Sequence, residues 1–225
     1  MKLSVIIPVY NEECTLLEVI RKIKEVDIRK ELIIVDDGSN DKTKNILDKI
    51  RDDTINIFRH PYNKGKGAAV RTALEYINGD IVIIQDADLE YEPDDYIKLI
   101  EPIITNIADI VYGSRFLAKK KVTTTFHYFV NRFLTLITNL LFNSSLTDME
   151  TCYKVFKTKI IKELNLESNG FEIEAELTSK VLKRGYKIYE VPIFYRSRSY
   201  HEGKKIAWRD GIKTLLAIFK YRLVR

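Results

Sequence analysis

The chain has 225 residues, of which 45% are hydrophobic, and carries a net charge of +5 at pH 7. This length suits one large domain, or one domain with an appendage, around a full core. Cys14 and Cys152 form no Cys-x-x-Cys or Cys/His cluster, which argues against a disulfide framework and a zinc site and favours a reducing, cytoplasmic setting. The first eight residues lack the apolar core of a signal peptide.

Strand-like and helix-like segments alternate along the first half of the chain. Strands are expected at 3–9, 32–35, 55–58, 81–84 and 110–112, and helices at 12–25, 42–51 and 66–77. Such alternation predicts an α/β fold with a mostly parallel sheet flanked by helices. Beyond residue 112 the order is less regular.

Two amphipathic segments follow. Apolar residues recur at helical spacing between residues 126 and 142, in a segment too short and polar for a membrane span of about 20 residues. Residues 206–225 combine a second apolar stripe with Lys and Arg, a pattern typical of a helix in a membrane interface. Packing of both helices onto the sheet is the alternative for part of each stripe. We therefore divide the chain into a domain at 1–205 and a basic helix at 206–225.

The positive charge is concentrated near the C-terminus. Residues 183–225 contain twelve Lys and Arg against three acidic residues. This imbalance favours an anionic partner, either nucleic acid or a membrane surface, although an ordinary solvated basic face is equally compatible. The nearby aromatic residues fit a helix core or interface anchors, so nucleic acid is the least favoured partner.

Carboxylates follow the expected strand at 81–84, where the chain reads Gln85-Asp86-Ala87-Asp88-Leu89-Glu90. A continuous Val/Ile run predicts a strand buried on both faces, and open α/β sheets bind ligands at the carboxyl ends of their strands. Asp86 and Asp88 are thus placed to hold a cation bound to a phosphate. An isolated Asp-x-Asp is more often a simple turn.

Two other strands end in polar residues at the same edge. One gives Pro8-Val-Tyr-Asn-Glu12 and the other Asp36-Asp-Gly-Ser39. Asp37 is placed to accept hydrogen bonds from a ribose or a base, although Asp-Asp-Gly-Ser alone is a common turn composition. Lys64 and Lys66 give a weak signal for phosphate binding at a helix start.

Together these motifs and Gly113-Ser-Arg115 resemble family 2 glycosyltransferases, in particular the dolichol-phosphate mannose synthase and polyprenyl-phosphate glycosyltransferase branch. The match runs from Leu3 to about Lys205. It implies a GT-A-type, Rossmann-like fold and inverting transfer of a sugar from a UDP- or GDP-linked donor to a polyprenyl phosphate. It also implies Mg²⁺ or Mn²⁺ as cofactor.

The resemblance implies donor-site residues by matched position. Those of the nucleotide pocket are Pro8, Tyr10, Glu12, Val35 and Asp37. Those that hold the metal and the donor diphosphate are Asp86, Ala87 and Asp88, with Glu90 where the family often has Gln, a departure that keeps an oxygen ligand. Those that contact the donor phosphates are Arg115, Arg198 and Lys204, the last two on a loop that matches the family only in part.

Chemistry supports these assignments independently of the resemblance. A departing diphosphate accumulates negative charge, which a metal ion and guanidinium groups stabilise. Arginine suits phosphate because its planar fork donates two hydrogen bonds at once. For Arg115 or Arg198 taken singly, a surface ion pair is the alternative.

The segment 146–154 resembles the acceptor-side acidic motif of the family, and Asp148 is our candidate nearest the reacting oxygen. A phosphate acceptor is mostly a dianion at pH 7 and needs little help from a base. Asp148 is therefore expected to orient a cation or Lys154, with a helix cap as the alternative. Arg132 is our candidate contact for the acceptor phosphate, and the apolar stripe beside it is expected to receive the isoprenoid chain.

Three further carboxylates, Glu172, Glu174 and Glu176, alternate along the chain, and we expect at least two of them at the surface.

Two other functions stay open. One is transfer to a glycan or a glycolipid headgroup, and the other is a non-enzymatic membrane-binding module, which the intact motifs disfavour. The expected location is the cytoplasmic membrane face with peripheral attachment, alone, as a homo-oligomer or with a membrane protein. The sequence does not select the sugar or the base.

Overall fold

The computed structural model describes residues 1–118, 125–198, 205 and 208–223. Its centre is a seven-stranded sheet in the order β3-β2-β1-β4-β6-β5-β7. The strands are β1 Leu3–Val9, β2 Lys30–Asp36, β3 Ile55–Arg59, β4 Ile81–Ile84, β5 Ile110–Ser114, β6 Lys154–Lys157 and β7 Ile188–Pro192. The helices are α1 Leu16–Glu25, α2 Thr43–Leu47, α3 Lys66–Leu74, η1 Pro93–Asp95, α4 Tyr96–Ile104, α5 Thr125–Phe142, α6 Thr158–Lys162, α7 Ile173–Lys183 and α8 Trp208–Leu223.

The central strands β1, β2 and β4 are Val/Ile-rich and almost wholly buried, as expected for strands covered on both faces. They pair in parallel with one another, and β3 joins β2 in the same direction. Their carboxyl ends therefore meet at one edge of the sheet. Only β6 runs against its neighbours β4 and β5 among the described strands. The predicted mostly parallel sheet flanked by helices is confirmed.

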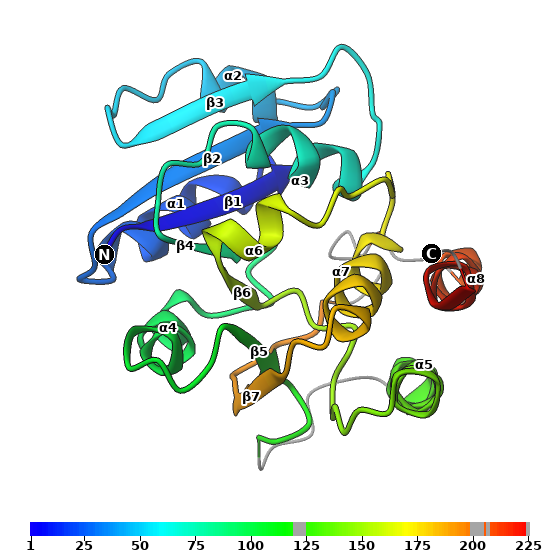
Figure 1. Cartoon of the computed structure of the whole chain (residues 1–225). Coiled ribbons are helices and arrows are strands. Elements are labelled where there is room, and N and C mark those ends of the chain that lie inside the picture. The colour runs from blue at the N-terminus through cyan, green and yellow to red at the C-terminus, as the bar shows by residue number, and fades with distance from the viewer. Residues whose placement is uncertain (119–124, 199–204, 206–207, 224–225) are drawn as a thin grey trace.

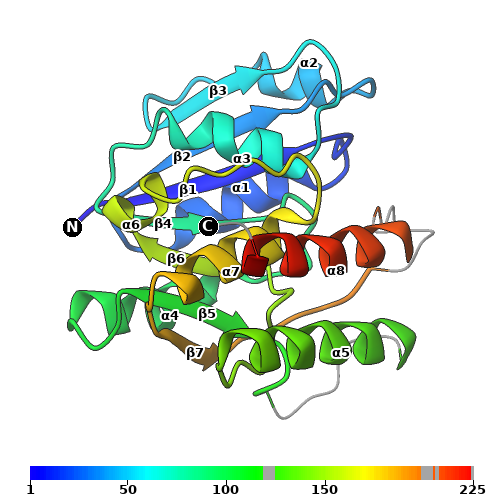
Figure 2. The same cartoon turned by 45° about the vertical axis from the view of Figure 1, so that its right-hand side comes forward.

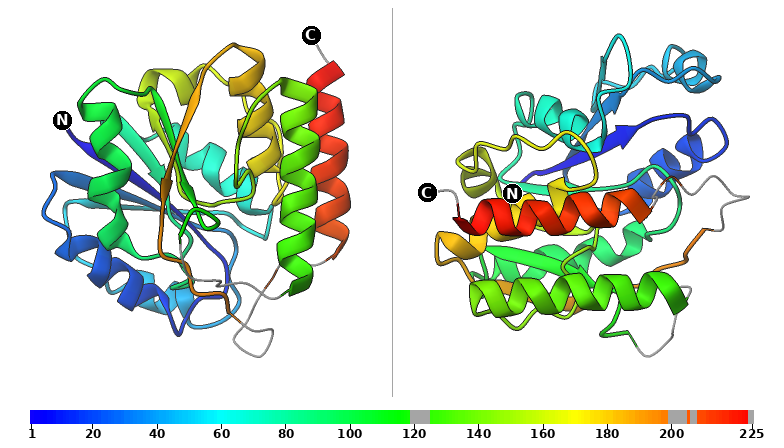
Figure 3. Two further views of the ribbon diagram at one scale, coloured as in Figure 1. Left: turned by 90° about the horizontal axis from the view of Figure 1, so that it is seen from below. Right: turned by 90° about the vertical axis from the view of Figure 1, so that its right-hand side faces the viewer.

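The helices form layers around the sheet (Figures 1 and 3). Helices α1 and α4 cover one face, and α3, α6 and α7 cover the other. Helices α5 and α8 form a further layer outside α7. The main core fills the space between the sheet and its covering helices, and a second core lies between α5, α7 and α8.

Helices α5 and α8 lie side by side and run in the same direction (Figure 2). Two contacts fix this alignment: Gly211 lies opposite Val130, and the Arg222 side chain donates to the Leu141 carbonyl. Each helix turns one apolar stripe inward, against α7 and the other helix, so part of each stripe is packed but mainly on α7 and not on the sheet as expected. Within the described parts of the chain, no helix is both long and apolar enough to span a bilayer.

The chain contains elements that the periodicity did not reveal, namely α4 before β5, and β6, α6, α7 and β7 after it. The strand β6 has only four residues, and β7 is half exposed, so neither gives the long Val/Ile run of a buried strand.

Candidate active site

A cavity of about 480 Å³ opens at the carboxyl ends of β1, β2 and β4. Its other walls include residues between 63 and 69, the start of α7 with the two residues before it, and Tyr195, Arg198 and Lys205. Of the predicted site residues, those that line it are Pro8, Tyr10, Glu12, Asp37, Asp86, Ala87, Asp88, Glu90, Arg115 and Arg198. The structure thus brings together residues up to 190 positions apart in sequence.

Asp37 holds the loop that forms one end of the cavity. Its carboxylate accepts hydrogen bonds from the backbone N–H groups of Lys64 (2.9 Å) and Gly65 (2.7 Å) and lies 2.6 Å from Nδ1 of His60. Gly65 has a φ of +102°, a conformation that side chains disfavour. The predicted contact of Asp37 with a ribose or base therefore competes with three partners inside the protein.

At the end of β4, Asp86 faces a lysine at the first residue of α3. The Lys66 ammonium lies 2.7 Å from Oδ1 of Asp86 and 3.0 Å from Oε1 of Glu174. Burial raises the pKa of Asp86, but the charge and hydrogen bond of Lys66, with a hydrogen bond from Cys152 and the Arg198 charge, together outweigh burial and lower this pKa below its usual value. The weak sequence signal for phosphate binding at Lys66 thus corresponds to an ammonium group that lines the cavity beside Asp86.

Arg198 contacts three further carboxylates of the cavity. Its guanidinium lies 3.1 Å from Asp88 and 3.1 Å from each oxygen of Glu12, and its backbone N–H donates to Glu90 at 2.6 Å. The Tyr195 hydroxyl donates to the other Glu90 oxygen at 2.8 Å. The segment 195–198 is therefore anchored to the Asp-x-Asp turn from the opposite side of the cavity.

The turn itself concentrates negative charge. Leu89 has a φ of +60°, which costs roughly 1–2 kcal/mol for a residue with a Cβ. Burial, together with the charges of Asp86 and Glu90, raises the pKa of Asp88 to about 7. Strained backbone and crowded carboxylates of this kind occur at functional sites.

The donor set at this turn fits a hard divalent cation. Asp86 and Asp88 supply carboxylate oxygens, and an added cation relieves their mutual repulsion. Both Glu90 oxygens already accept hydrogen bonds. In the described ranges no cluster of three His, Cys, Asp or Glu residues has the arrangement of a preformed metal site. A metal ion at this turn would therefore have to compete with Lys66 and Arg198 for the carboxylates of Asp86 and Asp88.

Arg115 and Asp148 form a buried pair beside the cavity. The guanidinium makes two hydrogen bonds of 2.7 Å to the carboxylate, and the Arg115 backbone N–H adds a third at 3.0 Å. Glu190 on β7 accepts the backbone N–H groups of Thr147 and Asp148, which fixes this segment. Asp148 orients Arg115, whereas Lys154 pairs with Glu174 at 2.5 Å.

Three of the predicted residues that the structure describes do not line the cavity, namely Asp148, Val35 and Arg132. Val35 is buried within β2. Arg132 donates to the Thr147 carbonyl at 3.0 Å and lies over the Phe116 ring, next to the Asp148 segment. Lys204 lies outside the described residues, while its neighbour Lys205 donates to Glu12 at 2.6 Å.

The prediction that at least two of Glu172, Glu174 and Glu176 are surface groups is wrong. Glu174 and Glu176 are buried because α7 lies between the sheet and α8. Glu174 pairs with Lys154 and Lys66, and Glu176 accepts from the backbone N–H groups at 167 and 168.

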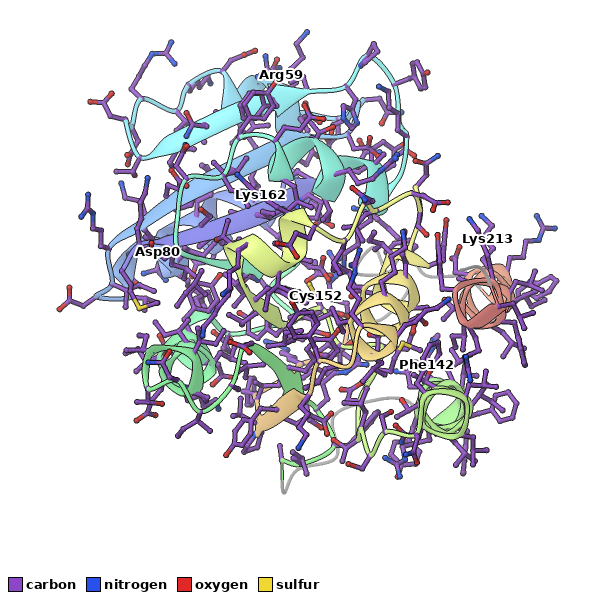
Figure 4. The ribbon with its side chains drawn as sticks, in the orientation of Figure 1. Arg59, Asp80, Phe142, Cys152, Lys162 and Lys213 are labelled. Carbon is purple, nitrogen blue, oxygen red and sulfur yellow. The ribbon has the colours of Figure 1, made fainter. Side chains whose placement is uncertain are left out.

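The sequence analysis also missed several residues that line the cavity. Glu150, Cys152, Phe171 and Tyr195 all line it. Figure 4 shows Cys152 in the middle of the molecule, beside α7. Glu150 and Cys152 belong to the quoted acceptor-side segment, so that motif was the available signal.

Comparisons with known proteins agree with this arrangement. Residues 4–164 match the model of the family described as glycosyl transferase family 2. A dolichol-phosphate mannosyltransferase of Pyrococcus furiosus is 29% identical over 212 residues, which cover 91% of this chain and 59% of that protein. A UDP-N-acetylglucosamine--dolichyl-phosphate N-acetylglucosaminyltransferase of Methanococcus voltae is 31% identical over 209 residues, which cover 84% of this chain and 83% of that protein.

Among solved structures, glucosyl-3-phosphoglycerate synthase from Mycobacterium tuberculosis, in complex with Mn²⁺, UDP and phosphoglyceric acid, is similar in fold. The TM-score is 0.75 at 20% sequence identity, and the match covers 100% of this chain and 79% of that one. The predicted GT-A-type fold is confirmed.

Proposed function

Because the chain belongs to glycosyl transferase family 2, we propose that it transfers a sugar from a nucleoside-diphosphate sugar to a polyprenyl phosphate at the cytoplasmic face of a membrane. The observation that carries this proposal is the alternation of charge in the cavity. Asp86 and Asp88 each face a cation, Lys66 or Arg198, at the edge where the strands of the sheet end. Such a site suits a diphosphate with a cation.

The residues of this site have distinct tasks in the proposed reaction. Bound Mg²⁺ or Mn²⁺, held by Asp86 and Asp88, would stabilise the negative charge of the departing diphosphate. Lys66 and Arg198 then exchange their carboxylate partners for phosphate oxygens. Attack by the lipid phosphate from the opposite side inverts the anomeric carbon, and its dianion needs no base at pH 7.

The outer face of α5 and α8 supports the membrane location. Nine large apolar side chains are exposed there: Phe129, Phe133, Leu136, Leu140, Trp208, Ile212, Leu216, Phe219 and Leu223. Lys and Arg residues accompany them on α8, with Arg132 on α5, and Lys213 points away from the sheet (Figure 4). An apolar stripe with basic neighbours suits an anionic bilayer surface. Arg132, on the same face of the molecule, would contact the acceptor phosphate.

Turnover with defined substrates tests the reaction. Purified protein is incubated with UDP-glucose, UDP-N-acetylglucosamine or GDP-mannose and a short polyprenyl phosphate, with and without Mn²⁺. We expect lipid-linked sugar with at least one donor, and a loss of at least about 100-fold for Asp88→Asn. Asp53→Asn removes an exposed carboxylate outside the cavity and should keep full activity. Transfer only to a soluble glycan would contradict the lipid acceptor.

Vesicle binding tests the location separately. Leu216→Asp should reduce the fraction of protein that cosediments with anionic vesicles by several fold, because it places a charge in the apolar stripe. Ile107→Asp alters an equally exposed residue after α4 and should bind as the wild type does. Equal binding by both variants would show that this face is not the membrane contact.

A further inference from the structure

The cavity has two ends, separated by the carboxylates of the β4 turn. Residues of β1, β2 and the 63–65 loop line one end. At the other end lie Arg115, Glu150 and Cys152, and Glu174 connects this end to the β4 turn through Lys66. A nucleoside-diphosphate sugar has its base and its sugar on opposite sides of the diphosphate. If the proposed function holds and the base lies over β1 and β2, the sugar occupies the Glu150 end.

Most polar groups at this end already have partners within the protein. Arg115 is held by Asp148, and Glu174 by Lys66 and Lys154. The Tyr195 hydroxyl donates to Glu90. Their hydrogen-bonding capacity is largely used, so they shape this part of the wall more than they select a ligand.

Glu150 differs from these groups. Its Oε1 atom is fully buried and has no hydrogen-bond partner among the described residues. Glu174 Oε1 also lacks a hydrogen bond but lies 3.0 Å from the Lys66 ammonium, whereas Glu150 forms no ion pair with a described residue. A buried acceptor without a donor destabilises the protein, and a ligand that supplies the donor recovers this cost. Burial, with the nearby charges of Glu174 and Asp148, raises the pKa of Glu150 to about 7, although Lys154 and Arg115 oppose this rise.

The chemistry of this atom restricts its ligand. The unpartnered Oε1 atom accepts hydrogen bonds and so attracts hydroxyl groups, and in its ionised form the carboxylate also repels phosphate oxygens. A neutral sugar carries several hydroxyl donors and fits, whereas an acceptor phosphate does not. We propose that Glu150 binds hydroxyl groups of the donor sugar and thereby helps to select the sugar among donors that share one base. This assignment rests on the proposed function.

Titration calorimetry separates sugar recognition from nucleotide recognition. UDP, UDP-glucose and UDP-N-acetylglucosamine, and likewise GDP and GDP-mannose, are titrated with Mg²⁺ into the wild type, Glu150→Ala and Glu150→Gln. We expect Glu150→Ala to weaken binding of the preferred sugar nucleotide about 10- to 100-fold and to leave the nucleoside diphosphate within about twofold. Glu163→Gln, at an exposed site outside the cavity, is the control and should change neither.

A donor with a deoxy sugar identifies the hydroxyl group that Glu150 binds. If Glu150 binds one hydroxyl group, the donor that lacks that hydroxyl should bind the wild type and Glu150→Ala equally. Glu150→Gln preserves the side-chain shape, and its near-ultraviolet circular dichroism shows whether the fold is intact if the alanine variant does not fold. Equal weakening of nucleotide and sugar nucleotide would indicate a structural role and overturn the assignment.

Two outcomes distinguish this assignment from the function on which it rests. A wild type that binds no nucleotide and no sugar nucleotide overturns both. A wild type that transfers sugar, with a donor preference unchanged in Glu150→Ala and Glu150→Gln, overturns the role of Glu150 alone.

Discussion

The two halves of the sheet hold their site residues by different means. In the half made of β3, β2, β1 and β4, functional carboxylates follow directly from the ends of buried parallel strands. In the half made of β6, β5 and β7, buried ion pairs hold them, such as Arg115 with Asp148 and Lys154 with Glu174. Strand topology therefore builds the first half of the site, and charge pairing across the chain builds the second.

The largest effect should come from breaking the buried pair of the second half. Asp148→Ala leaves the Arg115 guanidinium buried without its partner, which costs about 3–5 kcal/mol of unfolding free energy. Urea unfolding at pH 7 measures this loss. Asp109→Ala removes an exposed ion pair with Lys157 and should cost no more than about 1 kcal/mol. Similar values for both variants would contradict the contrast between the halves.

A smaller effect should come from the contact where the two halves meet. A Cβ at Gly67 would lie 2.3 Å from the Ser168 carbonyl oxygen, so Gly67→Ala should push α3 away from the segment 168–170. We expect a loss of about 1–3 kcal/mol in thermal or urea unfolding, with weaker nucleotide binding. Gly211→Ala is the matched helical control, because its Cβ would lie 3.7 Å from Val130. A stable Gly67→Ala protein with unchanged nucleotide affinity would refute this role.

The smallest effect is expected in the first half, at Glu31 on β2. Burial raises the pKa of Glu31, but hydrogen bonds from Lys2, Ser4 and the Asn78 backbone outweigh it and lower this pKa. A lowered folded-state pKa stabilises the protein above the unfolded value near 4.3, and this contribution is lost as pH falls through the folded value. Glu31→Gln should therefore cost about 1–2 kcal/mol at pH 7.

The same substitution should be nearly neutral in strongly acidic solution, which unfolding curves measured across pH would test. Glu75→Gln, at an exposed position, should show no such dependence. A Glu31→Gln deficit that stays constant down to low pH would mean that packing, not charge, carries the effect.

The sequence predicted the first half well because each signal was local. The Val/Ile runs of β1 and β4 end where the structure ends these strands, that of β2 ends one residue earlier, and polar residues after them line the cavity. The second half was harder because its order depends on distant partners. Nothing near Asp148 in sequence shows that it holds Arg115, and Glu174 seemed a surface group because its partners Lys66 and Lys154 lie outside its own helix.

The placement of the two thiols has a practical consequence. Cys152 is buried beside Asp86, and burial raises the pKa of its thiol, which makes it inert to alkylation at neutral pH. Cys14 is exposed two residues after Glu12, a partner of Arg198. A maleimide dye should therefore attach at one position at the rim of the cavity, where its fluorescence can report ligand binding in the native chain without any substitution.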